Sequence, residues 1–418
     1  MIKGKTKIIE LELTEPLRLI SGLADYQALW VLVRLHYVPL GLLKLELKTD
    51  CLSATALRRA IVGQFNFQIL EHLLADGGFE GLAELPQMFE KLAASCPYLK
   101  LPDPAPLVSL AICTRNRAES LARTLDSVSQ ITYPNFEVIV IDNAPDDERT
   151  AELLTGRFPH FRYVREPRPG LDNARNRAIR EASGEIVAFT DDDTVVDAHW
   201  LTALTVAFDS PDVMCVTGLV VPYELDHPAQ QLFENYGGFT RGFKQHVFHY
   251  NKRHSGYFYM YGAGRFGTGA NMAFRRTLFD QIGLFDPALD VGTVTNGGGD
   301  LDIYFRTLME QHTLVFEPAA LVWHVHRADS TRLHYQINGW GTGHAAFLTA
   351  ALLRYPKHSP TALHFSWNWF KDRLLMRMFK ESRRRQNGLF PLIVTETKGA
   401  VLGPFRYFQA RRQEKRKV

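Results

Sequence analysis

The stretch EIVAFTDDDTVV, residues 185–196, decides the fold class of this 418-residue chain. An apolar run beginning at Ile186 predicts a buried strand, and three consecutive aspartates follow it: Asp191, Asp192 and Asp193. Adjacent carboxylates repel one another. A chain that places three of them at the end of a buried strand is therefore expected to give them a cation to bind or a reaction to perform.

The segment upstream of this stretch repeats a pattern of strand followed by helix. Apolar strands are predicted at LVSLAI (107–112), FEVIVID (136–142) and FRYVRE (161–166), and each precedes a segment with helical periodicity. Strands that alternate with helices indicate parallel βαβ units, whose sheet is covered on both faces. Ligands bind at the carboxyl ends of such strands, so the loops there are expected to share one edge.

The sequence predicts three parts. Residues 1–100 alternate apolar and polar in KIIELEL and LLKLELK, with a turn expected at YVPLG (37–41), and then carry an amphipathic helix. This predicts a small N-terminal α+β module. Residues 107–330 carry the βαβ pattern, and residues 331–418 are expected to form a basic helical extension.

Composition indicates a soluble globular protein, with 46% apolar and 22% charged residues. No window holds 18 uninterrupted apolar residues, and the N-terminus lacks the apolar core of a signal peptide. The four cysteines show no CxxC spacing, which favours reduced core residues over a redox or zinc role. These features predict a cytoplasmic protein.

The charge is unevenly distributed. Residues 371–418 hold 14 Lys/Arg and 4 Asp/Glu, whereas the rest of the chain holds 34 and 41. Aromatic residues are interleaved with the basic ones, which suits an interfacial helix at the inner face of an anionic membrane. The alternative is a solvated basic helix packed on the acidic body. No nucleic acid is expected as a partner.

Polar residues follow the first, second and fourth predicted strands: TRNR (114–117), Asp142-Asn143 and the three aspartates. Asp142 alone could cap a helix. Three convergent loops suit a nucleoside diphosphate, because Mn²⁺ and Mg²⁺ are held by carboxylate and phosphate oxygens. The alternative for Asp191 and Asp193 is a solvated acidic turn.

A second cluster is NGGGDLDIYFR, residues 296–306. Its glycines leave room for a ligand, and Asp300 beside them is the candidate general base. Asp302 lies in the first turn of a helix, where stabilisation by the helix dipole is a sufficient explanation. Downstream, VWHVHR places His324 and His326 at the end of a strand, pointing the same way, where a histidine is either a metal ligand or a partly buried core residue.

Over residues 107–330 the chain resembles the family-2 glycosyltransferases, of bacterial type. The motifs that carry the resemblance occur in order: VSLAICTRNR, FEVIVIDN, GLDNARNRAIREASGEIVAFTDDD, NMAFRR, GLFD and GGGDLDIYFR. The resemblance implies a GT-A fold, which is Rossmann-like with a mainly parallel sheet, and a nucleotide-diphospho-sugar as donor. It also implies a divalent cation, Mn²⁺ or Mg²⁺.

The resemblance implies roles for individual residues as well. Asp191 and Asp193 fall on the family's DxD motif, which holds ribose, metal and diphosphate, and His324 resembles a late metal ligand. Asp300 falls on the catalytic base. The family's preceding glutamate is Gly299 here, which raises Asp302 as an alternative base. Implied donor contacts come from six residues: Thr114, Arg115, Asn116, Asp142, Arg175 and Asn176.

The expected activity is therefore metal-dependent, inverting transfer of a sugar to a hydroxyl of a glycan or lipid-linked acceptor, in cell-surface polysaccharide or glycolipid synthesis. Processive members carry QxxRW, whereas this chain has QINGW (336–340) with Gly339 in place of arginine, which favours transfer of one or few sugars. Two alternatives stay open. VAFTDDDTV also fits the DxDx(T/V) motif of haloacid-dehalogenase-like phosphatases, and the chain could be a catalytically inactive nucleotide-sugar-binding module.

Overall fold

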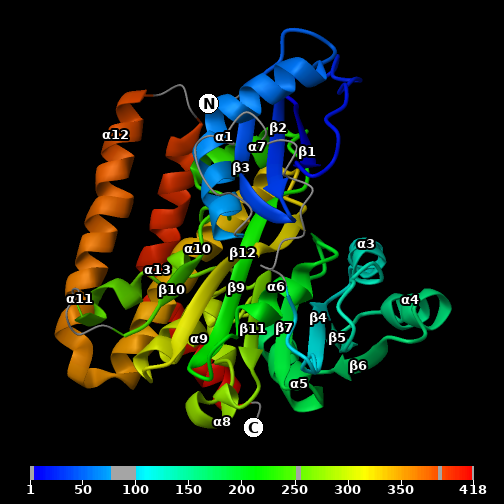
Figure 1. Cartoon of the computed structure of the whole chain (residues 1–418). Helices are drawn as coiled ribbons and strands as arrows, with labels where there is room; N and C mark the ends of the chain where they lie inside the picture. The colour runs from blue at the N-terminus through cyan, green and yellow to red at the C-terminus, as the bar shows by residue number, and fades with distance from the viewer. Residues whose placement is uncertain (1–3, 77–99, 251–255, 385–387, 417–418) are drawn as a thin grey trace.

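The computed structural model describes residues 4–76, 100–250, 256–384 and 388–416 (Figure 1). The N-terminal module contains β1 (Thr6–Glu12), β2 (Ala28–Leu35), β3 (Val38–Glu46) and α1 (Ala54–Ala75). Strand β2 lies between β1, to which it is parallel, and β3, to which it is antiparallel. The α+β prediction for this module is confirmed.

The turn predicted at YVPLG is wrong in its position. The β2–β3 connection is formed by His36 and Tyr37, both with positive φ, whereas Pro39 and Gly41 lie inside β3. Strand β3 is an edge strand, and its pairing with β2 shifts register next to the Arg34–Pro39 pair. A proline is tolerated there because its missing N–H interrupts no regular row of inter-strand hydrogen bonds.

The central sheet has the strand order β10-β12-β9-β11-β7-β4-β5-β6, and β8 pairs with β12. All pairs among β4 to β7 are parallel, as is β9 with β12, whereas β11 runs antiparallel to β7 and β9. The predicted mainly parallel α/β sheet is confirmed. The strands are β4 (Val108–Thr114), β5 (Phe136–Asn143), β6 (Arg162–Glu166), β7 (Ile186–Asp191), β8 (Thr194–Val196), β9 (Val213–Pro222), β10 (His246–Phe248), β11 (Asn271–Arg275) and β12 (Thr313–His324).

Helices cover both faces of this sheet because successive strand residues point to opposite sides. In β4, Leu110 and Ile112 belong to one core cluster and Ala111 to the other. The first cluster is covered by α3 (Ala118–Val128), α4 (Arg149–Arg157) and α6 (Trp200–Val206). The second is covered by α5 (Leu171–Glu181) and α9 (Gly299–Met309), with α8 (Leu278–Ile282) beside them.

The C-terminal part is helical, as predicted. It contains α10 (Ser330–Arg354), α11 (Ser359–Asn368), a π-helical turn Trp369–Met376, α12 (Arg377–Arg384) and α13 (Leu389–Lys415). Helices α10 and α13 can approach closely because Gly341 has no side chain. A Cβ at this position would lie 2.0 Å from the carbonyl oxygen of Glu396. Within the described ranges, no helix is both long and apolar enough to cross a membrane.

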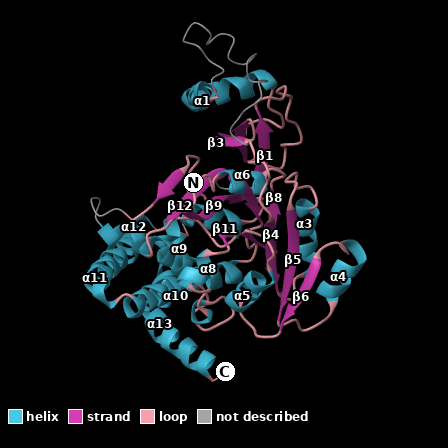
Figure 2. Cartoon of the chain, turned by 60° about the horizontal axis from the view of Figure 1, so that its bottom comes forward, coloured by secondary structure: helices cyan, strands magenta, loops and turns pink. Residues whose placement is uncertain are grey.

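The three parts pack together around the sheet (Figure 2). The C-terminal helices lie on the opposite side of the molecule from β5 and β6, and the N-terminal module lies beyond one end of the sheet. Arg34 of β2 is buried and pairs with Asp197 at 2.6 Å, which joins that module to the loop before α6. The proposed boundaries at residues 100, 107 and 330 stay predictions.

Candidate functional site

The predicted site begins at the carboxyl ends of three adjacent strands. Thr114 at the end of β4 is paired in register with Asp142 of β5, and Cys113 is paired with Asp191 of β7. The three polar loops therefore share one edge of the sheet, as the strand pattern predicts. Parallel pairing causes this, because it aligns the strand ends.

The three aspartates divide into two kinds. The middle one, Asp192, is buried and accepts hydrogen bonds from Thr114 Oγ1 at 2.7 Å and Arg117 Nη1 at 2.5 Å. Its carboxylate is thus consumed inside the protein, where it fixes the β4–α3 loop. Asp193 also pairs with Arg117 at 2.9 Å, but it and Asp191 each place a carboxylate oxygen near a ring nitrogen of His324.

Asp191, Asp193 and His324 offer donor atoms that all lie within 4.8 Å of one another. His324 Nε2 is 3.3 Å from an oxygen of Asp193. Burial by itself would raise the pKa of Asp193, but His324, Arg117 and Arg327 together hold it well below its usual range. Burial and the neighbouring Asp193 raise the pKa of Asp191. Two carboxylates and an imidazole form a donor set that suits a divalent cation.

The orientation of His324 is set by a buried chain of hydrogen bonds. His326 Nε2 lies 2.9 Å from Glu234 Oε1, and the Nδ1 atoms of His324 and His326 are 3.0 Å apart. Burial lowers the pKa of His326. In the tautomer that donates Nε2–H to Glu234, the Nδ1 of His326 is left to accept from His324. The Nε2 of His324 then faces Asp193.

Asp142 provides a different kind of group. Its side chain is buried, and its Oδ2 accepts a hydrogen bond from the Tyr163 hydroxyl at 2.9 Å. Its Oδ1 is buried and has no hydrogen-bond partner among the described residues, which leaves an acceptor for a ligand N–H or O–H. Burial raises the pKa of this carboxyl group.

The remaining β4-loop residues differ in their surroundings. Arg115 is exposed, whereas Asn116 exchanges two hydrogen bonds with Asp146, at 2.5 and 2.9 Å, and so ties this loop to the one after β5. Asn116 has φ 55°, a conformation that asparagine tolerates better than most residues. Both residues stay predictions as donor contacts.

Helix α5 carries Arg175 and Asn176, which play different parts. Burial alone would lower the pKa of Arg175, but Asp172, Asp191 and Asp300 raise it. The guanidinium therefore lies close enough to interact with two carboxylates that the sequence predicts to be functional, Asp191 and Asp300. Asn176 uses both ends of its amide on the backbone of Phe285, each at 2.9 Å. Its amide therefore anchors the loop before α9, and the structure gives no support for its expected donor contact.

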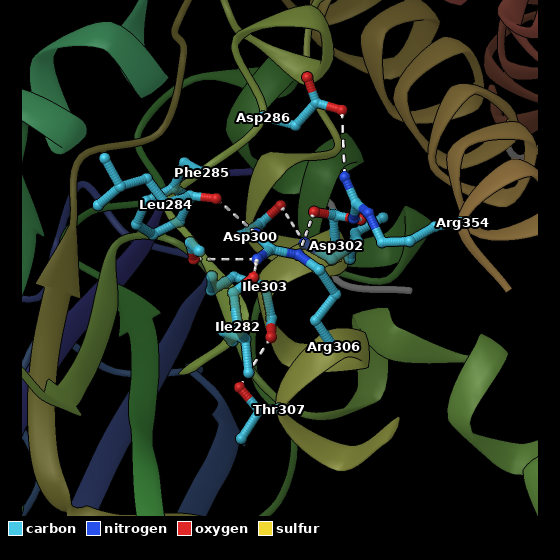
Figure 3. A network of polar contacts seen from close by, with 12 residues as sticks. Ile282, Leu284, Phe285, Asp286, Asp300, Asp302, Ile303, Arg306, Thr307 and Arg354 are labelled. Carbon is cyan, nitrogen blue, oxygen red and sulfur yellow. Dashed lines mark hydrogen bonds and ion pairs between the residues drawn. The ribbon is translucent and has the colours of Figure 1, made fainter. Parts of the chain in front are cut away.

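Asp300 lies half-buried in the first turn of α9, and its Oδ2 accepts from the Gly269 N–H at 3.1 Å. Asp302 is different, as Figure 3 shows: it is fully buried and pairs with Arg306 at 2.7 Å and Arg354 at 2.6 Å. The helix dipole alone therefore does not explain Asp302, which is the centre of an ion-pair network. Because it is enclosed and neutralised by two arginines, it is a poor alternative base.

Gly299 has a neighbour that the sequence does not reveal. A Cβ at this position would lie 2.0 Å from Asp172 Oδ2, so the Asp172 carboxylate occupies the space that a side chain here would need. Asp172 Oδ2 is buried and unpartnered among the described residues. Burial raises the pKa of Asp172 to about 7; Arg175 opposes this rise and Asp300 adds to it.

Sequence reasoning thus gave no role to Arg117, Asp172 and Glu234, and it left His326 open as a metal ligand or a partly buried core residue. Three of these stand in motifs already singled out: TRNR, GLDNARNR and VWHVHR. Only the folded chain shows which members of those motifs point at the site. Glu234, on α7 (Pro228–Tyr236), stands in no recognisable motif.

Comparison with known proteins agrees with this arrangement. Residues 109–283 match the family model described as Glycosyl transferase family 2. The protein named Uncharacterized protein y4gI of Sinorhizobium fredii is 29% identical over 235 residues, which cover 52% of this chain and 24% of that protein. A glucosyl-dolichyl phosphate glucuronosyltransferase of Haloferax volcanii is 24% identical over 188 residues, which cover 43% of this chain and 56% of that protein. The chain thus spans less than two thirds of the length of either relative.

Among solved structures, the mannosyltransferase PcManGT from Pyrobaculum calidifontis, in complex with GDP-Man and Mn²⁺, aligns with 18% sequence identity and a TM-score of 0.47. The alignment covers 73% of this chain and 91% of that one.

Proposed function

Because this chain carries a domain of glycosyl transferase family 2, over residues 109–283, we propose that it transfers a sugar from a nucleotide-diphosphate-sugar to an acceptor hydroxyl. The observation that carries the proposal is the shared sheet edge. It presents a buried carboxylate oxygen at Asp142 that has no partner among the described residues, beside the converging donor atoms of Asp191, Asp193 and His324. The Asp142 oxygen suits a nucleoside, and the cluster of Asp191, Asp193 and His324 suits a metal-bound diphosphate.

In this proposal Asp191, Asp193 and His324 hold a Mn²⁺ or Mg²⁺ ion, which supplies Lewis-acid stabilisation of the departing diphosphate. Arg117 pairs with Asp193 at 2.9 Å in the structure and is half-exposed, so it is placed to turn its charge toward the diphosphate once a cation takes its place. The Glu234–His326 pair keeps the His324 ring in one orientation.

Asp300 is the proposed general base, which takes the proton of the attacking acceptor hydroxyl. Its two oxygens accept from the backbone N–H groups of Gly269 and Leu301, at 3.1 and 2.9 Å, which orient the carboxylate. Asp172 places a second carboxylate in the space beside Gly299. Burial raises the pKa of Asp172, and the neighbouring Asp300 carboxylate adds to that rise. The transfer is proposed to be a single displacement with inversion.

We propose a lipid-linked acceptor, or a glycan on a membrane surface, and transfer of one or few sugars. The name of the Haloferax volcanii relative supports the first part, because that protein acts on a dolichyl-phosphate-linked sugar. The surroundings of Gly339 support the transfer of one or few sugars. A Cβ at this position would lie 2.6 Å from the Asn296 amide, so an arginine has no room there. The proposed setting is cell-surface polysaccharide or glycolipid synthesis.

Peripheral contact with an anionic membrane through the C-terminal helices is part of the same proposal. Trp367, Phe379, Phe405 and Phe408 are exposed beside basic residues, with Phe405 at 74%. Trp369 differs from these exposed aromatic residues, since its ring stacks on the His344 ring with the ring centroids 4.3 Å apart and faces inward. Exposed aromatic residues among lysines and arginines suit the headgroup region of a bilayer.

The test is a thermal-shift screen of nucleotide-diphosphate-sugars with and without Mn²⁺, followed by turnover of the best donor. A metal-dependent shift with a nucleotide-sugar supports the proposal. A shift with phosphate mimics and Mg²⁺ alone would instead favour the phosphatase alternative. The match to the glycosyl transferase family 2 model includes Asp191 and argues against that alternative. Binding with no turnover on any acceptor would indicate an inactive binding module.

A further inference from the structure

The N-terminal module contains a second cluster of metal-ligating side chains, far in sequence from the first. His36 Nδ1, His72 Nε2 and Asp76 Oδ2 form a triangle with sides of 2.8, 3.1 and 3.1 Å. Their side chains are only 6%, 10% and 9% exposed. We propose that these three residues bind a transition-metal ion of the Zn²⁺ class, which fastens the end of α1 to the β2–β3 turn.

The local structure explains how the three groups meet. His72 and Asp76 are four residues apart at the C-terminal end of α1, so they project from the same face of the helix. His36 comes from the two-residue turn between β2 and β3. Glu12 holds that turn by accepting the backbone N–H groups of His36 at 2.9 Å and Tyr37 at 2.8 Å. The imidazole is thus aimed at the helix end by a fixed backbone.

The triangle has the dimensions of one face of a coordination polyhedron. Zinc binds imidazole nitrogen and carboxylate oxygen at roughly 2.0–2.2 Å, so neighbouring ligands lie about 3 Å apart, from roughly 2.9 Å at a right angle to roughly 3.3 Å at the tetrahedral angle. An ion roughly 1 Å above the plane of this triangle would reach all three atoms at such a distance. A fourth position would point away from the triangle, for water or another group.

Direct hydrogen bonds among these three atoms would crowd two N–H groups against one oxygen. If both imidazoles donate to Asp76, two N–H groups stand 3.1 Å apart and point at the same oxygen. A single divalent ion satisfies two neutral nitrogens and one carboxylate at the same time.

The ligand set also separates this cluster from the proposed nucleotide-sugar site. Two imidazoles and one carboxylate favour zinc over magnesium, whereas Asp191 and Asp193 supply the oxygen ligands that Mg²⁺ and Mn²⁺ accept. The turn that carries His36 also carries Tyr37, whose ring lies 4.2 Å from the His199 ring in front of α6. A metal here would therefore stiffen the contact between the N-terminal module and the sheet.

The experiment uses the full-length protein, stripped with a chelator and titrated with Zn²⁺ against a competing chromophoric chelator, with stoichiometry from elemental analysis. We expect one Zn²⁺ ion to bind tightly to the wild-type protein and equally well to Asp193→Ala. In His72→Asn the Zn²⁺ affinity should fall at least about 100-fold, which is the upper end of the loss caused by removing an outer-sphere partner. The same ion should raise the unfolding temperature of the stripped protein, including the Asp193→Ala variant.

Because His72→Asn could fail to fold, Co²⁺ is added to the stripped wild-type protein and to Asp193→Ala. Intense visible absorption bands of a four-coordinate Co²⁺ ion are expected in both. The proposal is overturned if the folded protein binds no Zn²⁺ at micromolar free concentration. It is equally overturned if the bound ion survives His72→Asn and disappears in Asp193→Ala, because the metal would then lie at the other site.

Discussion

The substitution Asp302→Asn should destabilise the fold, although Asp302 stands only two residues from the proposed base. Its carboxylate is completely buried and binds two guanidinium groups, of which Arg306 is 3% exposed and Arg354 is 35% exposed. Arg306 cannot turn away when the carboxylate is lost, because it also donates to the backbone oxygens of Ile282, Gly283 and Leu284 at 2.6, 3.0 and 2.8 Å (Figure 3).

The expected loss comes mainly from Arg306. Breaking a buried ion pair by neutralising one partner costs about 3–5 kcal/mol, because it leaves an uncompensated buried charge. The pair with Arg354 adds less than about 1 kcal/mol, since solvent reaches that side chain. An asparagine keeps the shape, but its NH₂ group opposes the N–H groups of one arginine. We therefore expect Asp302→Asn to lower the free energy of unfolding by about 3–5 kcal/mol.

The assay is urea unfolding followed by circular dichroism, with turnover measured on the folded fraction. Two matched controls accompany it. Arg354→Gln should lose less than about 1 kcal/mol. Asp300→Asn should lose only about 0.3–1 kcal/mol of helix-terminus stabilisation, while turnover falls by about 10²–10⁴-fold and donor affinity stays nearly constant.

Two results would refute this reasoning. If Asp302→Asn unfolds within about 1 kcal/mol of wild type, the network does not carry the stability assigned to it. If Asp302→Asn keeps its stability and loses turnover, or Asp300→Asn loses donor binding together with turnover, the base has been assigned to the wrong aspartate.

Three further outcomes are expected. Asp193→Ala should abolish Mn²⁺-dependent binding of a nucleoside diphosphate in titration calorimetry, and unchanged affinity would remove Asp193 from the metal site. Gly299→Ala should displace the Asp172 carboxylate and lower turnover by about 10²-fold with donor affinity retained, because small misplacements near the chemistry are costly; full activity would show that Asp172 has no part in it. Trp367→Ser together with Phe379→Ser should reduce co-sedimentation with anionic liposomes, whereas equal pelleting would reject the membrane contact.

The amino-acid sequence by itself determined the central architecture and the sheet edge at which the candidate site lies. Alternation of apolar strands and helices is a local property, and parallel pairing then aligns the strand ends without further information. Thr114, Asp142 and Asp191 could therefore be assigned to one edge from the strand pattern alone. The grouping of Asp191, Asp193 and His324 was predictable for a similar reason, because each residue lies in a recognisable motif at the end of a strand, and its metal role stays a prediction.

Only the tertiary structure decided what each carboxylate does. Asp300 and Asp302 look alike in the sequence, yet one is half-buried beside Gly269 and the other is enclosed by two arginines. Asp172 and Gly299 come from different helices, and their contact follows from how α5 and α9 pack on the same face of the sheet. Burial and long-range ion pairs depend on the complete three-dimensional surroundings of a group, which local periodicity does not encode. The meeting of His36 with the end of α1 is decided in the same way, by the packing of a helix against a turn.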